Sequence, residues 1–259
     1  MSVPLAVEAI QARLSSAPIG HRILHYPSVG STMDVARREA EQGAPEGTVV
    51  VADEQTAGRG RFGRHWVSGS GQSLLFSIVL YPERTALAGL NIIAPVAVIT
   101  AIQRTTALSP TLKWPNDVLV AGKKVCGILV EAAVQDGGIR HAVLGFGINV
   151  NFDPSGATQI AGLSTSLSNE LGETVSREAV MEAVLEELSA LYGRLKDWTA
   201  VRHRWEASLE TLGSRVRVQW GERVEEGLAE AVDAEGNLLL RRSDGTVVTL
   251  SGGDVTSQI

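Results

Sequence analysis

The sequence predicts an α+β protein in two parts, a large domain at residues 1–212 and a small β domain at residues 213–259. Apolar residues recur at helical spacing in several segments of the first part, and continuous apolar runs lie between those segments. The first pattern is typical of amphipathic helices and the second of buried strands. After Gly213 short alternating segments are separated by turn residues, which predicts a small barrel of the SH3 size.

The large part is predicted to alternate helices with strands. Helices are expected at about residues 3–16, 31–42, 88–107 and 176–198, with a further helix to about Leu212. Strands are expected at residues 48–52, 73–80 and 139–150, and a hairpin that turns at Ala121–Lys123 is expected at 117–131. Ser31 or Thr32 is expected to cap the second helix, and Pro95 to disturb the third. In the small part, strands are expected at residues 216–220, 238–240 and 247–250.

Composition and charge argue against several classes of protein. The net charge of −6 is acidic, whereas a protein whose main work is to hold nucleic acid usually has a basic balance or face. The single cysteine, Cys126, cannot form a disulfide within the chain, and the N-terminus has no cationic start followed by an apolar core. No apolar segment free of charged residues is expected to be long enough to span a membrane. A cytoplasmic protein is therefore expected.

Residues 57–72 are the first candidate functional segment, and we call them the arginine loop. They hold five glycines, three arginines and no apolar periodicity, which predicts a long loop. The run Gly58–Arg64 matches G-x-G-x-x-G, but no helix pattern follows, which argues against a dinucleotide site. A solvated loop is the plain alternative. The functional interpretation is phosphate capture, because Arg59, Arg61 and Arg64 carry permanent charge in planar forks and would repel one another without a bound anion.

The segment Lys113–Asp117 is the second candidate. Pro115 is expected to hold Trp114 in an extended conformation, so that Asn116 and Asp117 stand at the start of the next strand. This is either a simple turn that leads into a strand, or a site at which Asp117 holds hydrated Mg²⁺ on ATP. Lys124 lies across the predicted hairpin and is expected to face the same pocket.

Other motifs narrow the chemistry. Gly122–Lys124 lacks the earlier glycine and the Ser or Thr of a P-loop, and no G-x-S-x-G elbow supports a hydrolase. The histidines at residues 21, 25, 65, 141 and 203 have no metal-ligand spacing, so a structural zinc site is not expected. Gly127 would allow a ligand to approach closely, and its neighbour Cys126 is expected to be a small buried filler.

Taken in order, these motifs resemble the biotin–protein ligase family. The resemblance rests on Gly30–Thr32, Glu54–Trp66, Lys113–Asp117, Lys123–Glu131 and Gly145–Asn151, and Gly252–Val255 resembles the family's C-terminal domain. It covers roughly residues 22–259. It implies a catalytic domain like that of class II aminoacyl-tRNA synthetases and lipoate ligases, a mixed sheet with flanking helices, followed by an SH3-like barrel. Only about 25 residues precede the catalytic start, so the chain resembles the monofunctional members without an N-terminal DNA-binding domain.

The resemblance also implies roles for matched residues. The positions that hold biotin are Ser31, Thr32, Gln55, Gly58, Arg59 and Lys124, with a pocket wall at Gly127, Leu129 and Gly145. The expected catalytic residues, around the carboxylate and phosphate, are Arg59, Arg61 and Lys124. The nucleotide-binding positions are Arg61, Arg64, Trp66, Asn116 and Asn149. Asp117 is expected to bind the Mg²⁺ of ATP.

The implied substrates are biotin and ATP with Mg²⁺, and the implied partner is a biotin carboxyl carrier protein that offers a lysine. No tightly bound protein metal, DNA or membrane is expected, and a homodimer is left open. A lipoate or octanoate ligase is the nearest alternative, against which the arginine loop and Gln55 argue by resemblance. A non-enzymatic nucleic-acid binder is the alternative from another class, disfavoured by the acidic total and by the single Arg-Gly loop. After Gly253 the chain lacks the basic residue that some relatives carry there.

Overall fold

The computed structural model describes residues 4–157, 160–195 and 199–257. The helices are α1 (Val7–Arg13), α2 (Thr32–Glu41), α3 (Leu87–Thr105), α4 (Leu167–Leu171), α5 (Arg177–Tyr192) and α6 (Thr199–Ser208). The strands of the larger part are β1 (Ile23–Tyr26), β2 (Val49–Ala52), β3 (Ser73–Leu80), β4 (Thr111–Lys113), β5 (Asp117–Val120), β6 (Lys123–Gln135) and β7 (Gly138–Asn149). Those of the smaller part are β8 (Arg215–Trp220), β9 (Arg223–Val232), β10 (Leu238–Arg241), β11 (Val247–Leu250) and β12 (Asp254–Ser257).

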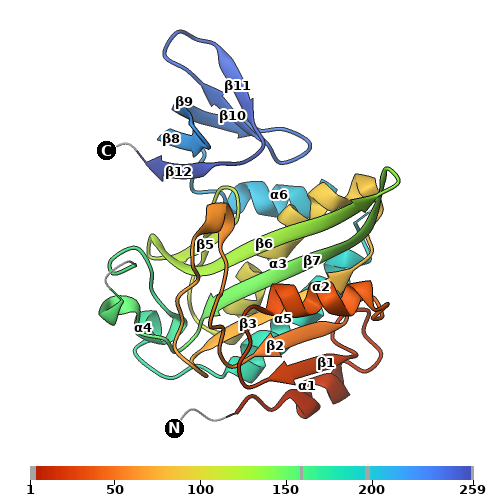
Figure 1. Ribbon diagram of the computed structural model, residues 1–259. Helices are drawn as coiled ribbons and strands as arrows, with labels where there is room; N and C mark the ends of the chain where they lie inside the picture. The colour runs from red at the N-terminus through yellow and green to blue at the C-terminus, as the bar shows by residue number, and fades with distance from the viewer. Residues whose placement is uncertain (1–3, 158–159, 196–198, 258–259) are drawn as a thin grey trace.

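These strands form two sheets (Figure 1). The large sheet has seven strands in the order β1-β2-β3-β7-β6-β5-β4, and β1 pairs with β2 in parallel while the other neighbours are antiparallel. The small sheet has five antiparallel strands in the order β11-β10-β9-β8-β12. The expected mixed sheet with flanking helices, followed by a small β domain, is confirmed. A domain boundary at residues 212 and 213 stays a prediction.

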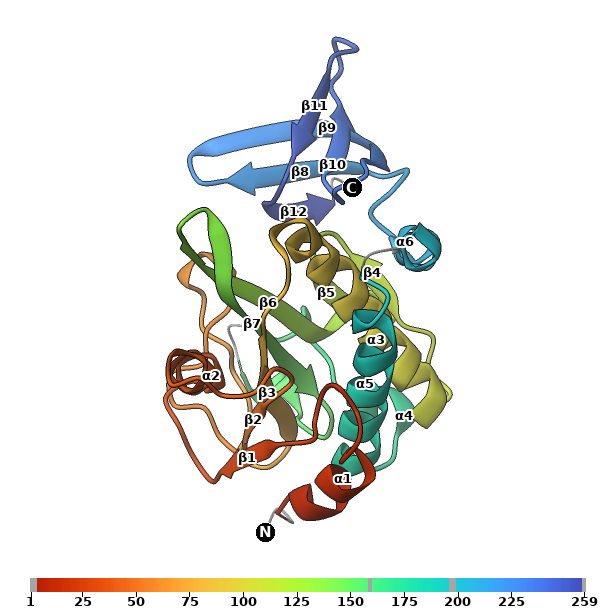
Figure 2. The same ribbon diagram turned by 90° about the vertical axis from the view of Figure 1, so that its right-hand side faces the viewer.

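The helices cover both faces of the large sheet (Figure 2). On one face α3 and α5 pack together over the sheet, and side chains such as Phe76, Phe146 and Ile148 fill the core beneath them. On the other face α2 packs on β2, β3 and β7, with a smaller core that includes Met33, Val79 and Val143. Because side chains alternate along a strand, β2, β3 and β7 contribute to both cores.

The same alternation opens a space beside α2. Along β7 the α2 face reads Val143, Gly145, Gly147 and Asn149, so large side chains give way to glycines. On β3, Ser77 pairs with Gly145 and continues this change from apolar to small and polar. The sheet face next to α2 therefore has room above it that no side chain of the sheet fills.

The expected hairpin is present. β5 and β6 join at Ala121 and Gly122, both in the left-handed region with φ of 50° and 72°, and β6 then runs on to Gln135. Ser31 is the N-cap residue of α2, as expected, but among the described residues its hydroxyl makes no capping hydrogen bond. Pro95 lies inside a continuous α3. Trp198, which the sequence placed on the helix from Ser176, lies outside the described residues.

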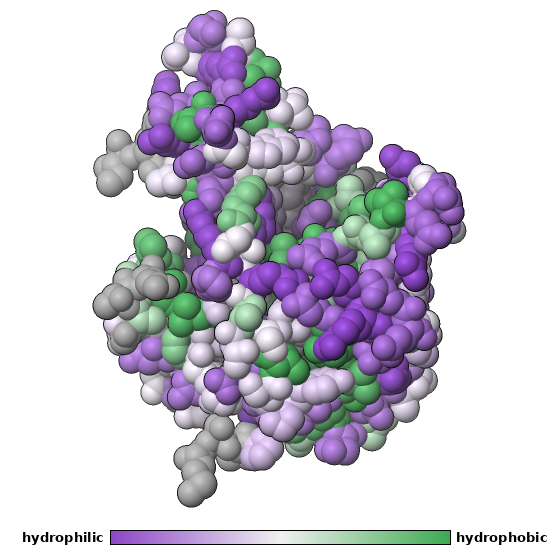
Figure 3. Space-filling model, viewed as in Figure 1, coloured by the Kyte–Doolittle hydropathy of each residue, from purple (hydrophilic) through white to green (hydrophobic). Residues whose placement is uncertain are grey.

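The expectation that no segment has the length and composition of a membrane span was wrong. Residues 85–103 carry no charged side chain, and the helical stretch Arg84–Thr105 is long and apolar enough to cross a membrane. In the fold α3 packs against α5, α6 and the sheet, and its most apolar window is 67% buried. A mostly buried helix needs little polar surface, so a core helix can match a membrane span in composition. On the face in Figure 3 hydrophilic residues predominate, with small separate hydrophobic areas.

Candidate active site

A cavity of about 670 Å³ occupies the space beside α2. It is lined by the start of α2, the arginine loop, the central strands β5, β6 and β7, and the small sheet. Every site residue predicted from the sequence lines it except Gly58; these are Ser31, Thr32, Gln55, Arg59, Arg61, Arg64, Trp66, Asn116, Asp117, Lys124, Gly127, Leu129, Gly145 and Asn149. One cavity thus collects residues from segments that lie far apart in the sequence.

One end of the cavity is neutral, buried and rich in hydrogen-bonding groups. The backbone N–H and hydroxyl of Thr32 both donate to Gln55 Oε1, at 2.7 and 3.0 Å, and the Thr32 hydroxyl lies 2.8 Å from that of Ser77. Ser31 is 2% exposed, and its hydroxyl has no partner within the described part of the chain. A buried hydroxyl without a partner is costly, so this end is built to receive a polar ligand group.

Gly58 stands behind this end rather than in the lining. Its carbonyl accepts a hydrogen bond of 2.9 Å from the Trp66 N–H, which closes the arginine loop. A Cβ at residue 58 would come within 3.1 Å of Gln55 Nε2 and of the Trp66 carbonyl. The glycine therefore lets the loop pass close to Gln55, which is a supporting position and not a direct contact with the cavity.

The floor of the cavity is made of glycines under the indole of Trp66. A Cβ on Gly147 would lie 2.5 Å from Trp66 Cε2, and one on Gly127 would lie 2.8 Å from Trp66 Cζ3. Gly127 and Gly147 are paired neighbours on β6 and β7, so the ring rests on bare backbone. The indole N–H of Trp66 is buried and finds no acceptor among the described residues. A flat ring with a free donor suits stacking against a planar ligand.

The cationic centre of the cavity is Lys124. Its Nζ lies 2.7 Å from Asp117 Oδ1 and 5.5 Å from the centre of the Trp66 ring. The expectation that Lys124 and Asp117 face one pocket is confirmed. A backbone hydrogen bond from the Lys124 N–H to the Leu163 carbonyl, at 3.0 Å, fixes the strand that carries this lysine.

The arginine loop is folded more tightly than the sequence predicts. Arg59 and His65 form an antiparallel bridge, and the Gly60 N–H donates to the Arg64 carbonyl at 2.7 Å. The turn between them, Arg61–Gly63, carries Phe62 at φ 54°, a conformation that non-glycine residues rarely adopt. The loop is thus a short closed ribbon held at its base, and not an open chain.

Groups of the protein contact each arginine of this ribbon without a bound anion. The expected repulsion is also present, because after burial the charge of Arg64 further lowers the pKa of Arg61. Arg59 Nη1 donates to Asp34 at 2.6 Å, Arg61 Nη1 donates to Asn116 Oδ1 at 2.9 Å, and Arg64 forms an ion pair with Asp254. Arg61 also donates to the Gly253 carbonyl at 3.3 Å, and its burial lowers its pKa. Arg59 is thus held by helix α2, Arg61 by the turn before β5 and by the small domain, and Arg64 by the small domain.

Metal and thiol chemistry find little support in the side chains that the structure describes. Among those residues, no group of three or more His, Cys, Asp or Glu is placed to hold a metal ion. Asp117 already pairs with Lys124 and offers one carboxylate. Cys126 is fully buried on the opposite face, and that burial raises the pKa of its thiol well above the usual range, so it behaves as a filler.

Sequence reasoning missed several residues of the site. Gly147 follows Gly145 by two positions, so strand alternation alone places it on the same face and signals a second floor residue. Met33 reaches the floor as well, because a Cβ on Gly145 would lie 2.4 Å from its sulfur. No local pattern predicts the contributions of Gly253 and Asp254 from the small sheet.

The class of protein is defined by comparison with known families. Residues 26–149 match the Biotin/lipoate A/B protein ligase family, and residues 211–256 match the Biotin protein ligase C terminal domain. A solved biotin protein ligase from Aquifex aeolicus, in complex with biotin and ATP, has a TM-score of 0.76 and 28% identity, covering 92% of this chain and 98% of that one. The ligase of Leishmania major in complex with biotinyl-5-AMP has a TM-score of 0.57 and 26% identity, covering 89% and 99%.

Relatives with similar sequences show which members of the matched biotin/lipoate ligase family the chain is similar to. The biotin–[acetyl-CoA-carboxylase] ligase of Mycobacterium tuberculosis is 34% identical over an alignment of 265 positions, which covers 97% of this chain and 95% of the relative. The bifunctional ligase/repressor of Bacillus subtilis is 33% identical over 249 residues, 93% of this chain and 76% of the relative. The chain belongs to the biotin protein ligase family.

Proposed function

We propose that the protein joins biotin to ATP to form biotinyl-5′-AMP, and then transfers the biotinyl group to a lysine of a biotin carboxyl carrier protein. The observation that carries this proposal is a single cavity with a buried neutral end, a cationic centre and an aromatic platform over glycines. An acid with a polar head, its carboxylate and a nucleotide base would each meet a matching environment there. Membership of the family and the ligands named for its solved members support the assignment.

The neutral end suits the ureido head of biotin. A urea has a carbonyl that accepts and two N–H groups that donate, and each of these groups needs a hydrogen-bond partner when it is buried. Ser31 supplies a hydroxyl without a partner in the described structure, while Thr32 and Ser77 form a fixed hydroxyl pair beside it. We assign this end to the ureido group and the floor at Leu129 and Gly145 to the rest of the biotin ring system.

The first step brings two anions together. An oxygen of the biotin carboxylate attacks the α-phosphorus of ATP, a new P–O bond forms, and the bond to the β-phosphate oxygen breaks to release pyrophosphate. Lys124, Arg59 and Arg61 line the cavity, where they would offset the charge of the carboxylate and of the reacting phosphate. Cations that are already held in place lose little freedom at the moment of reaction.

Mg²⁺ enters this proposal as part of the substrate, bound to the phosphates of ATP. One carboxylate, Asp117, faces the cavity next to Lys124, which fits a cation that keeps most of its water and phosphate ligands. Asp117 would hold that hydrated ion from one side. It would also keep the Lys124 ammonium pointed at the reacting groups.

The second step is acyl transfer. The amine of the carrier lysine attacks the carbonyl of the mixed anhydride, a C–N bond forms, and AMP leaves with the bridging oxygen. A free lysine has a pKa of about 10.4, so the amine must lose a proton before it attacks. The anhydride also reacts with water, so a covered cavity favours the correct acceptor.

The decisive experiment is ATP–pyrophosphate exchange with the purified protein. Biotin should stimulate exchange in the presence of Mg²⁺, and lipoate and octanoate should stimulate it far less when each is offered alone. Stimulation by lipoate that matches stimulation by biotin would assign the protein to the other branch of the matched family. No stimulation by any of the three acids would remove the proposed function.

The carrier and the quaternary state need their own tests. Biotin, ATP and a biotin carboxyl carrier protein should give a labelled carrier, detected as a mass increase on one lysine. The oligomeric state is open between monomer and homodimer, and the cytoplasmic location stays a prediction; light scattering and cell fractionation would test them.

A further inference from the structure

We propose that Asp34 is a positioning residue, which holds the guanidinium of Arg59 across the end of the cavity so that Arg59 meets the carboxylate of the acid substrate in a fixed orientation. This inference rests on the proposed function, because it takes Arg59 to bind that carboxylate. Asp34 belongs to none of the motifs from which the site was predicted.

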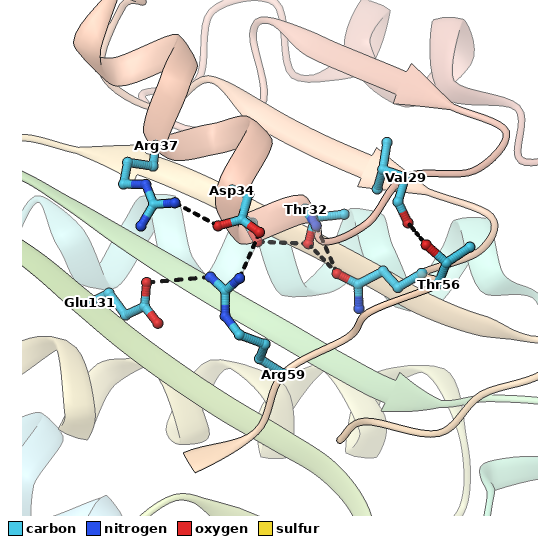
Figure 4. Close-up of polar contacts among 9 residues, drawn as sticks. Val29, Thr32, Asp34, Arg37, Thr56, Arg59 and Glu131 are labelled. Atoms are coloured by element: carbon cyan, nitrogen blue, oxygen red, sulfur yellow. Dashed lines mark hydrogen bonds and ion pairs between the residues drawn. The ribbon is translucent and has the colours of Figure 1, made fainter. Parts of the chain in front are cut away.

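The contacts form a bridge from helix to sheet (Figure 4). Asp34 lies in the first turn of α2, and its Oδ2 accepts a hydrogen bond of 2.6 Å from Arg59 Nη1. On the other side, Arg59 Nη2 lies 3.7 Å from Oε2 of Glu131 on β6. One guanidinium thus bridges α2 and β6, with a short contact to Asp34 and a longer one to Glu131.

Strand pairing locates this bridge relative to the cavity. Glu131 pairs with Val143, and the next pair on the same face, Leu129 with Gly145, lines the cavity floor. Residues two apart on a strand share a face, so the bridge stands one pair beyond the floor. Arg59 itself lines the cavity, while Asp34 and Glu131 stand behind it. The bridge therefore forms an end wall whose inner surface is Arg59.

Asp34 is itself held in place. Arg37, one helical turn along α2, donates from Nη2 to Asp34 Oδ1 at 2.7 Å, so each carboxylate oxygen contacts a different guanidinium. The hydrogen bond from Arg59 is the main reason that the pKa of Asp34 lies below its usual value, so the carboxylate is charged at neutral pH. A guanidinium has five N–H donors and Asp34 uses one, which leaves donors for a ligand.

Because the Arg59–Asp34 pair is partly exposed, its loss should change the orientation of Arg59 more than the stability of the fold. The side chains of Arg59 and Asp34 are 35% and 36% exposed, and ion pairs this open to solvent contribute little to the stability of a fold. Removing the charge of Asp34 should therefore leave the protein folded. What it should remove is the orientation of a flexible side chain, which binding must then restore at its own cost.

The test is Asp34→Asn, which keeps the shape of the side chain and removes its charge. In biotin-dependent exchange, KM for biotin should rise roughly 3- to 10-fold, the range expected for one hydrogen bond to a ligand group. Neither kcat nor KM for ATP should change by more than about twofold. Asp34→Glu should restore at least part of the affinity. The matched control is Asp244→Asn on the hairpin of the small sheet, which should leave KM for biotin unchanged.

A double-mutant cycle shows whether Asp34 changes KM for biotin through Arg59. If Asp34 acts through Arg59, then Asp34→Asn should change KM for biotin by less than about twofold in an Arg59→Gln background. The same fold-change in both backgrounds would overturn the proposal. So would a lower KM in Asp34→Asn, because Asp34 would then compete with the substrate for Arg59. Lack of exchange in the wild-type protein would overturn the proposed function together with this inference, whereas a normal wild type with an unaltered Asp34→Asn would overturn this inference alone.

Discussion

The two ends of the cavity differ in how their polar groups are held. At the end beside α2, Thr32 and Ser77 are both at most 2% exposed, and their hydroxyls bond within a helix start and a central strand. The charged part of the cavity lies along the irregular arginine ribbon, where the side chains of Arg59 and Arg64 in their ion pairs are 35% and 69% exposed. The first set is fixed by the packing of regular elements, whereas the second is fixed by contacts that solvent can reach.

The two ends therefore interact with a ligand through different forces. Buried neutral hydrogen bonds are not screened by salt and cost much when one partner is removed. Exposed ion pairs are screened by salt, and at Arg64 a ligand anion can replace the carboxylate of Asp254 at little cost. The neutral end should therefore select the acid by shape and hydrogen bonding. The charged end can rearrange as substrates and products come and go.

The largest effect is expected when the charged centre loses its lysine. Lys124→Ala should lower biotin-dependent exchange by roughly 10²–10³-fold, as for the loss of one preorganised group that stabilises developing charge. The mutation also leaves Asp117 facing the phosphates without its cation. Initial rates at saturating biotin and ATP measure the effect, and circular dichroism checks the fold.

The neighbouring lysine provides the control. Lys123 is exposed at the β5–β6 turn, and Lys123→Ala should retain near-normal exchange. If Lys124→Ala also retained it, Lys124 would be only the structural partner of Asp117, and the charged centre would have no catalytic role.

The next effect concerns the floor that both ends share. Gly147→Ala places a methyl group where Trp66 Cε2 would be 2.5 Å away, so the indole must move. KM for ATP should rise by about tenfold, since an aromatic contact contributes ~0.5–1.5 kcal/mol beyond its buried area. Gly138→Ala, on the same strand with its nearest atom at 3.7 Å, should have no such effect. Unchanged ATP affinity in Gly147→Ala would mean that the nucleotide does not use the indole.

A smaller effect tests the neutral end directly. Ser31→Ala removes a buried hydroxyl that has no partner in the described structure, so the thermal midpoint should stay the same or rise. KM for biotin should nevertheless increase about 3- to 10-fold, because the ligand loses one hydrogen bond. Thr32→Val should differ by lowering stability too, since that hydroxyl lies within hydrogen-bonding distance of Ser77 and Gln55. A Ser31→Ala protein that binds biotin normally would place the ureido group elsewhere.

The sequence predicted those elements whose pattern is strong and local. β3 and β7 are long, almost wholly buried strands, and their apolar runs identify them. β9 was missed because Arg223–Val232 is rich in Glu and Ala, which are poor strand formers, and is interrupted by Gly227. That glycine is required by the sheet, since a Cβ there would lie 2.3 Å from the Arg241 carbonyl. Such a requirement comes from the partner strand and leaves no local signal.

For the site, too, local features were predicted from the sequence and long-range contacts were not. The motif segments and the shared face of Lys124 and Asp117 followed from short-range patterns and resemblance. The partners of the arginines did not, because Asp34 lies 25 residues from Arg59 and Asp254 lies 190 residues from Arg64. A carboxylate at those distances looks like any other surface acid until the fold brings it close. The sequence therefore predicted the repulsion among the arginines but not the protein groups that offset it.

The smallest effect should come from the ion pair that joins the arginine ribbon to the small sheet. Arg64 and Asp254 are 69% and 32% exposed, so their pair is weak, and Asp254→Asn should leave both fold and exchange rate nearly unchanged. It should still free one side of the ribbon, which carries three arginines that trypsin can cleave. Limited digestion of Asp254→Asn without ligand should therefore cut near residue 60 about two to three times faster than digestion of the wild type.

The control is Glu230→Gln, which breaks the Arg241 pair in the same sheet and should not change that rate. Biotin with ATP should slow cleavage in both proteins, because ordering of the ribbon and binding of the adenylate are reciprocal. If Asp254→Asn is cut no faster than the wild type, the ribbon is held by its own base and by Arg59 and Arg61, and the exposed pair has no part in the difference between the two ends.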